Sequence, residues 1–311
     1  MKELAVTPGQ AWGTWKTVSE ISPRVIIDEA ALSVTFAVVA DEACFEWLRR
    51  ELVGAEASEA ELAVADTVLK RMDTPPSFDS AGFYTFTVYV TAPDEPIGLR
   101  GKNAVPFSGE LPEIIGWILK ARPDLCIALS RALKRFRGPA CDQLIHRASK
   151  ANSQIAFLSA VPKLIPVPLP FLPISSLADV ILLTKNQAML IMRLAAAYGH
   201  RPGYNRQVKE LLGAVAAALG WRTLARELVD FVPLGLGAAI KAAIAYSGTV
   251  AAGKTTIFFY ETGKTPTAAQ IRAFEKEAKS DGEAVAKELE EGGVTEAPPA
   301  EPVPEPADST D

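Results

Sequence analysis

The sequence predicts a mostly helical α+β fold, with a small α/β domain over residues 15–110 and an all-helical domain over residues 111–290. Runs of alternating or β-branched residues, which are typical of strands, occur only in the first domain. From Leu111 onward the apolar residues recur at helical spacing instead. The Pro- and Glu-rich segment over residues 292–311 is expected to be disordered, because it has too few apolar residues to form a core.

The first domain begins with an amphipathic segment over residues 12–30. LSVTFAVVA, residues 32–40, alternates apolar residues on one face and predicts a strand. A helix is expected next, with Phe45, Leu48 and Leu52 at helical spacing, and a second helix over residues 58–72. FYTFTVYVTA, starting at Phe83, predicts a second strand because aromatic and β-branched residues favour sheets, and KNAVPF predicts a weak third strand.

The second domain is expected to consist of helices connected by short breaks. PKLIPVPLPFLP, residues 162–173, contains five prolines and excludes one continuous helix there. A charged, solvated helix is expected over residues 266–291. The other predicted helices cover residues 112–121, 124–136, 141–161, 175–199, 206–221, 222–232 and 233–263.

Charge and cysteine content exclude several classes of protein. The net charge of −5 arises from the five acids of residues 292–311, since the remainder holds 32 acids and 32 bases. A body without excess positive charge predicts no nucleic-acid partner. The three cysteines lack C-x-x-C spacing and there are only two histidines, so we expect no metal site and no disulfide framework. The first residues contain no apolar stretch, so no signal peptide is expected.

One short stretch matches a phosphate-binding loop. GTVAAGKTT, residues 248–256, fits G-x-x-x-x-G-K-[ST] with Gly248, Gly253, Lys254 and Thr255 at the fixed positions. A phosphate loop needs a strand before it, but here small residues recur every fourth position, which indicates a closely packed helix. We therefore interpret the stretch as helix, and a phosphate site remains the alternative. The small residues that precede and enter the motif are Gly235, Ala239, Ala243, Ser247 and Ala251.

A polar stripe interrupts the apolar helix over residues 175–199. Asp179, Asn186 and Arg193 are spaced seven residues apart and share one face. The stripe is either a ligand or ion site within a bundle, a buried network with its hydrogen bonds satisfied, or a partly solvated edge. Lys241 interrupts the last apolar helix and is expected to reach an interface or to pair with an acid. No catalytic residues are predicted, because two histidines form no Ser/His/Asp grouping.

Four stretches carry a resemblance to a known family: ASKANSQ, the proline-rich hinge, LADVILLTKNQ with MRLAAAYG, and FVPLGLGAAIKAAIAYSGTVAAGKTTIFFYETG. They are similar to the helical domain of unknown function that follows Era-like GTPases and is related to YcjF-type membrane proteins. The resemblance covers residues 135–263 and implies that residues 15–110 are a degenerate GTPase-like domain. After the first strand, DEACFEWL lacks glycine and lysine, and it places Asp41 and Glu42 where backbone amides should meet phosphate.

The expected function is that of a non-catalytic protein, membrane-associated or acting as a scaffold, that has lost nucleotide binding and needs no cofactor. The alternative is an unorthodox GTP-binding protein or GTPase. None of the apolar stretches is an uninterrupted run of the ~20 residues that a spanning helix needs. We therefore expect a helical bundle at the cytoplasmic face of a membrane, peripheral or partly inserted, with a soluble cytoplasmic bundle and a multi-pass protein as alternatives. Expected partners are the membrane surface, a membrane protein or a second copy bound through the small-residue helix faces.

Overall fold

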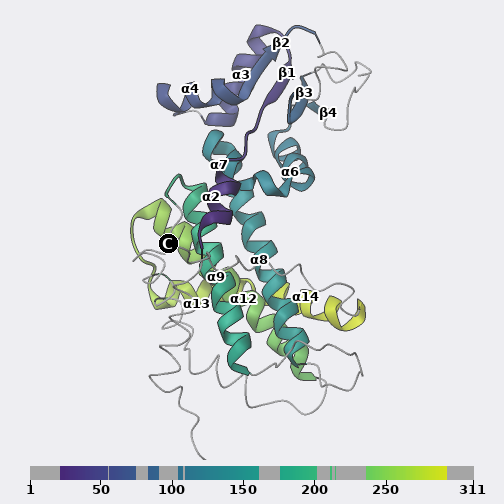
Figure 1. Ribbon diagram of the computed structural model, residues 1–311, viewed down its shortest axis with the longest axis vertical. Coiled ribbons are helices and arrows are strands. Elements are labelled where there is room, and N and C mark those ends of the chain that lie inside the picture. The colour runs from purple at the N-terminus through teal and green to yellow at the C-terminus, as the bar shows by residue number, and fades with distance from the viewer. Residues whose placement is uncertain are drawn as a thin grey trace, which may run out of the picture. The chain divides into compact units, whose positions relative to one another are not determined.

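The computed structural model describes residues 22–54, 56–74, 83–90, 104–107, 109–160, 176–201, 211, 214 and 236–292 (Figure 1). The chain divides into two compact units, each described here by itself. The sheet unit comprises residues 25–144 and 195–201, and the bundle unit comprises residues 145–194 and 202–311 together with residues 1–24. The predicted fold class is confirmed, because the described residues are mostly helical and include a small parallel sheet.

The elements of the sheet unit alternate between strands and helices in its first half and are helical in its second half. They are α2 (Arg24–Ala30), β1 (Phe36–Val39), α3 (Glu42–Val53), α4 (Glu59–Val68), β2 (Leu69–Met72), β3 (Phe86–Val90), β4 (Ala104–Phe107), α6 (Leu111–Ala121), the 3-10 turn η1 (Pro123–Leu125), α7 (Cys126–Ala132) and the 3-10 turn η2 (Lys134–Phe136). Helices α6 and α7, which the sequence analysis grouped with the helical domain, belong to this unit.

The sheet has four parallel strands in the order β2-β1-β3-β4. β1 lies in the middle, with Phe36 opposite Leu69 of β2 and opposite Phe86 of β3. Both faces of β1 are buried, as expected for a central strand between helices: Phe36 is 2% exposed and Ala37 is fully buried. The two predicted strands and the weak third strand are confirmed as β1, β3 and β4.

The prediction of a helix over residues 58–72 was wrong at its end. α4 ends at Val68, and the next four residues form the edge strand β2. Leu69 has extended backbone, with φ −96° and ψ 125°, and its side chain is buried. Pairing with β1 is a contact between residues distant in sequence, so it overrides a local helical pattern that continues through residue 72.

Local capping explains where α3 and α4 begin. Asp41 is the N-cap of α3, and Ser58 forms a capping box with Glu61 at the start of α4. The residues predicted to face the core on α3, Phe45, Leu48 and Leu52, are buried.

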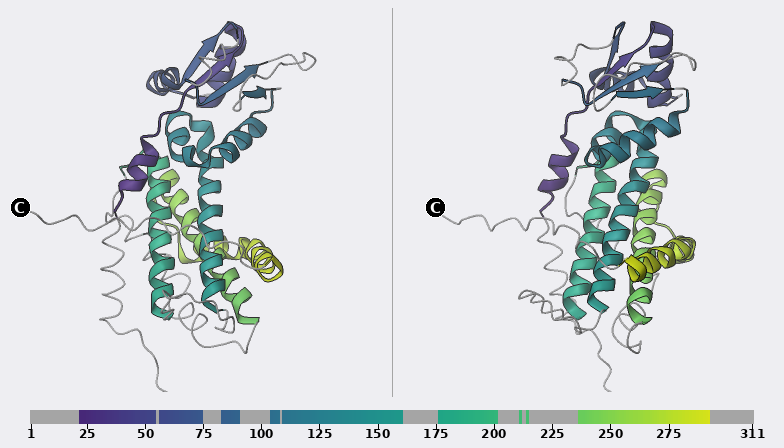
Figure 2. Two further views of the ribbon diagram at one scale, coloured as in Figure 1. Left: turned by 45° about the vertical axis from the view of Figure 1, so that its right-hand side comes forward. Right: turned by 90° about the vertical axis from the view of Figure 1, so that its right-hand side faces the viewer.

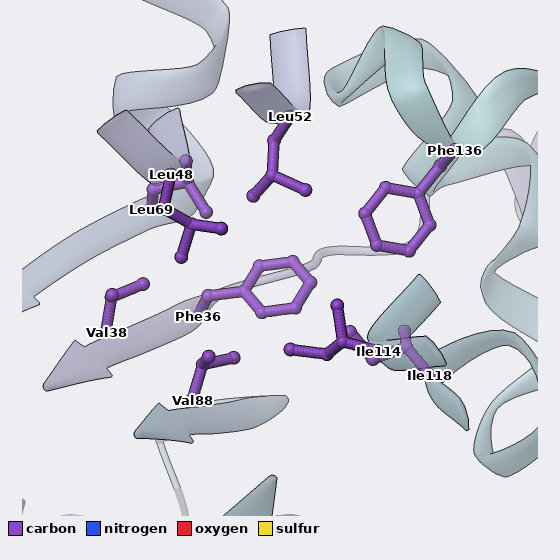
Figure 3. Close-up of a pocket in the computed structure, with 9 residues that line it drawn as sticks. All are labelled: Phe36, Val38, Leu48, Leu52, Leu69, Val88, Ile114, Ile118 and Phe136. Carbon is purple, nitrogen blue, oxygen red and sulfur yellow. The ribbon is translucent and has the colours of Figure 1, made fainter. Parts of the chain in front are cut away.

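One cavity lies beneath the sheet (Figure 3). Its volume is about 10 Å³, which is room for no more than about one water molecule. Its lining is apolar throughout, so the cavity is a packing defect of the core and too small to hold a ligand. The lining residues come from the strands, α3, α6 and η2: Phe36, Val38, Leu48, Leu52, Leu69, Val88, Ile114, Ile118 and Phe136.

The bundle unit is built on three long helices that lie side by side (Figures 1 and 2). Its elements are α8 (Arg137–Ala160), α9 (Ser176–Ala197), α12 (Leu236–Thr262), α13 (Ala268–Glu277) and α14 (Lys279–Gly292), of which α8 and α9 also contribute residues to the sheet unit. Gly199 follows α9 with a φ of 87°, as expected for a helix end. The proline-rich stretch over residues 162–173 and nearly all of the helices predicted over residues 206–232 lie outside the described residues.

The prediction of one charged, solvated helix over residues 266–291 was wrong. The segment forms two helices, α13 and α14, that meet at Ala278, and each buries one face. α14 packs on α12 through small residues, since a Cβ atom added to Gly282 would lie 2.8 Å from the Ala243 carbonyl oxygen. The many charged residues predicted a helix exposed on all sides. One face of α14 is nevertheless buried, and it is formed by Gly282, Val285, Ala286 and Leu289.

Candidate functional site

The stretch that matches a phosphate loop lies entirely within α12. Residues 248–256 are helical, so their backbone N–H groups point along the helix toward carbonyls one turn earlier and form no phosphate-binding concavity. Gly248, Gly253 and Thr255 are buried. Gly248, Gly253 and Thr255 of the motif therefore serve helix packing.

Gly253 permits a close approach of α8 to α12. A Cβ atom at this position would lie 2.5 Å from Cγ1 and 2.7 Å from Cδ1 of Ile145. Ala252 and Thr256 are also fully buried, and the Thr256 hydroxyl donates a hydrogen bond to the Ala252 carbonyl at 2.8 Å. Lys254 points away from this contact, is about one-third exposed, and pairs with Glu277 of α13 at 2.8 Å.

A polar seam, formed by Asn152 of α8, Asn186 of α9 and Thr249 of α12, connects the three long helices. Asn186 Nδ2 donates a hydrogen bond to Asn152 Oδ1 at 2.8 Å. Asn152 Nδ2 in turn donates to Thr249 Oγ1 at 2.8 Å, and Thr249 Oγ1 donates to the Ala245 carbonyl at 2.7 Å. Asn152 and Thr249 are fully buried, so these hydrogen bonds form away from water and fix the register of the helices.

Three further polar residues of α8 surround the seam. Ser153 donates a hydrogen bond to the Ala242 carbonyl at 3.0 Å, and the buried Ser149 hydroxyl has no hydrogen-bond partner among the described residues. His146 Nδ1 lies 3.1 Å from the hydroxyl of Tyr246 on α12. Burial, followed by the negative charge of Asp281, raises the pKa of Tyr246.

Of the predicted polar stripe, only Asn186 takes part in the seam. Arg193 is half-buried one turn after the buried Met189. Asp179 lies within α9, but its side chain is outside the described residues. Asn152 and its neighbours Ser149 and Ser153 were not predicted to be part of a polar site, although their spacing places three polar residues on one face of a helix.

The seam cannot perform acid–base chemistry, because amide and hydroxyl groups do not titrate near neutral pH. Within the described residues no group of three or more His, Cys, Asp or Glu side chains could hold a metal ion. The geometry therefore indicates a role in fixing helix positions.

The N-terminus of α3, directly after β1, is where a phosphate would bind in a nucleotide-binding sheet domain. Here Asp41 Oδ1 accepts a hydrogen bond from the Cys44 amide at 2.8 Å. The Cys44 amide lowers the pKa of the Asp41 carboxyl, and the hydrogen bond to the Asp41 side chain raises the pKa of the Cys44 thiol. Glu42 follows as the first residue of α3 and pairs with Arg71 of β2 at 2.9 Å.

No helix among the described residues has both the length and the apolar character that crossing a bilayer requires. No protein-family model matches this chain, and neither the curated proteins nor the solved structures contain a match to it.

Proposed function

We propose that this chain is a non-catalytic protein, membrane-associated or acting as a scaffold, whose sheet unit has lost nucleotide binding. The observation that carries the proposal is the Asp41 carboxylate at the N-cap of α3. It accepts the hydrogen bond that an exposed amide would otherwise offer to a phosphate. A nucleotide placed there would also face the negative charges of Asp41 and Glu42, which repel it.

The bundle unit supports the interaction role. Its helices meet at close contacts through Gly253 and Gly282, and the polar seam fixes their register. A bundle whose long helices are held in register by internal hydrogen bonds is suited to present a fixed surface to a partner. The resemblance to the helical domain that follows Era-like GTPases agrees with such a role, and we place the protein at the cytoplasmic face of a membrane or in the cytoplasm.

The strand order favours the alternative, an unorthodox GTP-binding protein. In the order β2-β1-β3-β4 the direction of strand addition reverses between β1 and β3. Parallel sheets bind ligands outside the carboxyl ends of the strands at such a point. The alternative therefore needs a nucleotide that tolerates Asp41 at that position.

Fluorescent GTP mixed with the purified full-length chain tests the proposal. We expect no saturable binding at nucleotide concentrations on the order of tens of micromolar. Asp41→Asn retains an N-cap side chain but removes the charge, and Asp124→Asn removes a carboxylate of η1 as a matched control. Saturable binding by the unaltered protein would overturn the loss of nucleotide binding and establish the alternative.

Membrane association is tested separately by fractionating cells that express the full-length chain. Recovery in the membrane pellet, with release by carbonate, would support a peripheral protein. Recovery in the soluble fraction alone would refute membrane association and would be consistent only with the scaffold role. Release only by detergent would indicate insertion into the bilayer.

A further inference from the structure

Three exposed apolar side chains, one from each long helix, mark one end of the bundle unit. They are Leu158 of α8, Leu182 of α9 and Ile240 of α12, with exposed fractions of 37%, 42% and 51%. We call these three residues the apolar end. Apolar residues exposed singly are common on a protein surface. Leu158, Leu182 and Ile240 differ from such residues because they share one end of the bundle and have lysines near them.

The hydrogen bonds of the bundle place the three residues at the same end. α8 runs antiparallel to α12, since His146 contacts Tyr246 whereas Ser153, further along α8, contacts Ala242. From the polar seam toward this end, Leu158 is six residues from Asn152, Leu182 four residues from Asn186, and Ile240 nine residues from Thr249. At a rise of about 1.5 Å per residue, these steps correspond to roughly 9, 6 and 14 Å.

The direction of α9 agrees with this placement. Arg137 near the start of α8 stacks on Tyr198 directly after α9, with its guanidinium carbon 5.1 Å from the ring centroid. Asn152, later in α8, bonds Asn186, earlier in α9. α8 and α9 are therefore antiparallel, and the C-terminal part of α8 lies beside the N-terminal part of α9.

A lysine stands beside two residues of the apolar end: Lys185 is three residues after Leu182, and Lys241 directly follows Ile240. Lys185 and Lys241 make no ion pair within the described part of the chain, whereas other lysines of the bundle do. The paired lysines are Lys150 with Glu288 and Lys254 with Glu277.

We propose that the apolar end docks on an anionic lipid surface, with Leu158, Leu182 and Ile240 entering the headgroup region and Lys185 and Lys241 contacting lipid phosphates or carboxylates. This inference rests on the membrane-associated form of the proposed function. A lysine can extend its apolar stem along the helix and place its ammonium group at the headgroups. A second copy fits this end less well, since the lysines of two copies would face one another.

Helix α14 leaves Ile240 of α12 exposed. Gly282 packs against α12 at Ala243 and Tyr246, which lie nearer to the polar seam than Ile240 does. Ile240 thus lies further from the polar seam than the residues of α12 that Gly282 meets.

Co-sedimentation of the full-length chain with vesicles tests the proposal. Vesicles of phosphatidylcholine alone are compared with vesicles that also contain phosphatidylserine, and we expect binding to the anionic vesicles that weakens at high salt. The double variant Lys185→Gln with Lys241→Gln should bind about 25-fold more weakly, from about a fivefold loss per lysine. The control, Lys279→Gln with Lys287→Gln, removes two exposed lysines of α14 and should bind like the unaltered chain.

The apolar contribution is tested with Leu182→Ser and Ile240→Ser, which alter exposed side chains and should leave the thermal melt unchanged. We expect both to weaken vesicle binding, with Val64→Ser of the sheet unit as a matched control at similar exposure. Failure of the unaltered chain to bind anionic vesicles would overturn the proposal, as would equal losses in the α14 lysine control. Self-association without lipid that Ile240→Ser abolishes would assign the apolar end to a second copy instead. None of these results bears on nucleotide binding, which the fluorescent GTP experiment decides separately.

Discussion

Replacing Gly282 with alanine should weaken the contact between α14 and α12. The new Cβ atom would lie 2.8 Å from the carbonyl oxygen of Ala243, 3.4 Å from its Cα atom and 3.4 Å from Cβ of Tyr246. Ordinary non-bonded contacts lie at about 3.5 Å, so α14 has to move away by roughly 0.7 Å. Because the obstructing atom belongs to the backbone of α12, no change of side-chain rotamer can relieve the overlap.

The magnitude follows from two opposing contributions. Overpacking costs about 1–3 kcal/mol, whereas exchange of glycine for alanine in a helix stabilises by about 0.5–1 kcal/mol. The free energy of unfolding should therefore fall by up to about 2.5 kcal/mol, or α14 should separate locally from α12. Urea denaturation measures the first outcome, and amide hydrogen exchange of residues 279–292 measures the second.

Gly116→Ala is the matched control, because Gly116 lies in α6 and a Cβ atom there would meet no atom within 4 Å. The same exchange should there stabilise the sheet unit by about 0.5–1 kcal/mol. If Gly282→Ala raised the stability as Gly116→Ala does, and left hydrogen exchange in α14 unchanged, the close contact with α12 would be refuted.

Three other predictions concern α12, the polar seam and the end of β1. Ala252→Leu should destabilise the protein by about 1–3 kcal/mol, because Ala252 is fully buried. Lys254→Ala removes a partly exposed ion pair and should cost less than about 1 kcal/mol. Thermal melts in which Lys254→Ala is the less stable variant would contradict the helical packing of residues 248–256. Asn186→Leu removes the donor to the buried side-chain oxygen of Asn152, so the free energy of unfolding measured with urea should fall by about 1–3 kcal/mol. An unchanged midpoint would mean that water replaces the lost donor. Asp41→Asn should lower the pKa of the Cys44 thiol, so alkylation of Cys44 should become faster at a given pH near neutrality. The same variant should remove the contribution of Asp41 to acid unfolding, because a carboxyl whose pKa is lowered in the folded state stabilises less as pH falls below the ordinary pKa of an aspartate. Identical acid unfolding of both proteins would contradict the N-cap role of Asp41.

The sequence by itself determined those features that depend on local spacing. The alternating residues of LSVTFAVVA and the β-branched FYTFTVYVTA predicted β1 and β3, since a half-buried or buried strand requires such residues wherever it pairs. The four-residue repeat of small side chains around GTVAAGKTT predicted helix α12, since the same repeat cannot form a strand followed by a turn. The helical spacing of Phe45, Leu48 and Leu52 predicted helix α3, whose N-cap is Asp41.

Only the tertiary structure decided the features that depend on a partner distant in sequence. Leu69 is in strand β2 and not in α4, because pairing with β1 gives its backbone hydrogen bonds and buries its side chain. Gly282 and its neighbours on α14 became buried because the small side chains of α12 leave room for close approach, which charge-rich sequence alone does not reveal. Asn152 joined the polar seam because Asn186 and Thr249, 34 and 97 residues away, come within hydrogen-bond distance in the fold. Spacing along one helix predicts which residues share a face, but only the packing of the helices determines which face contacts another helix.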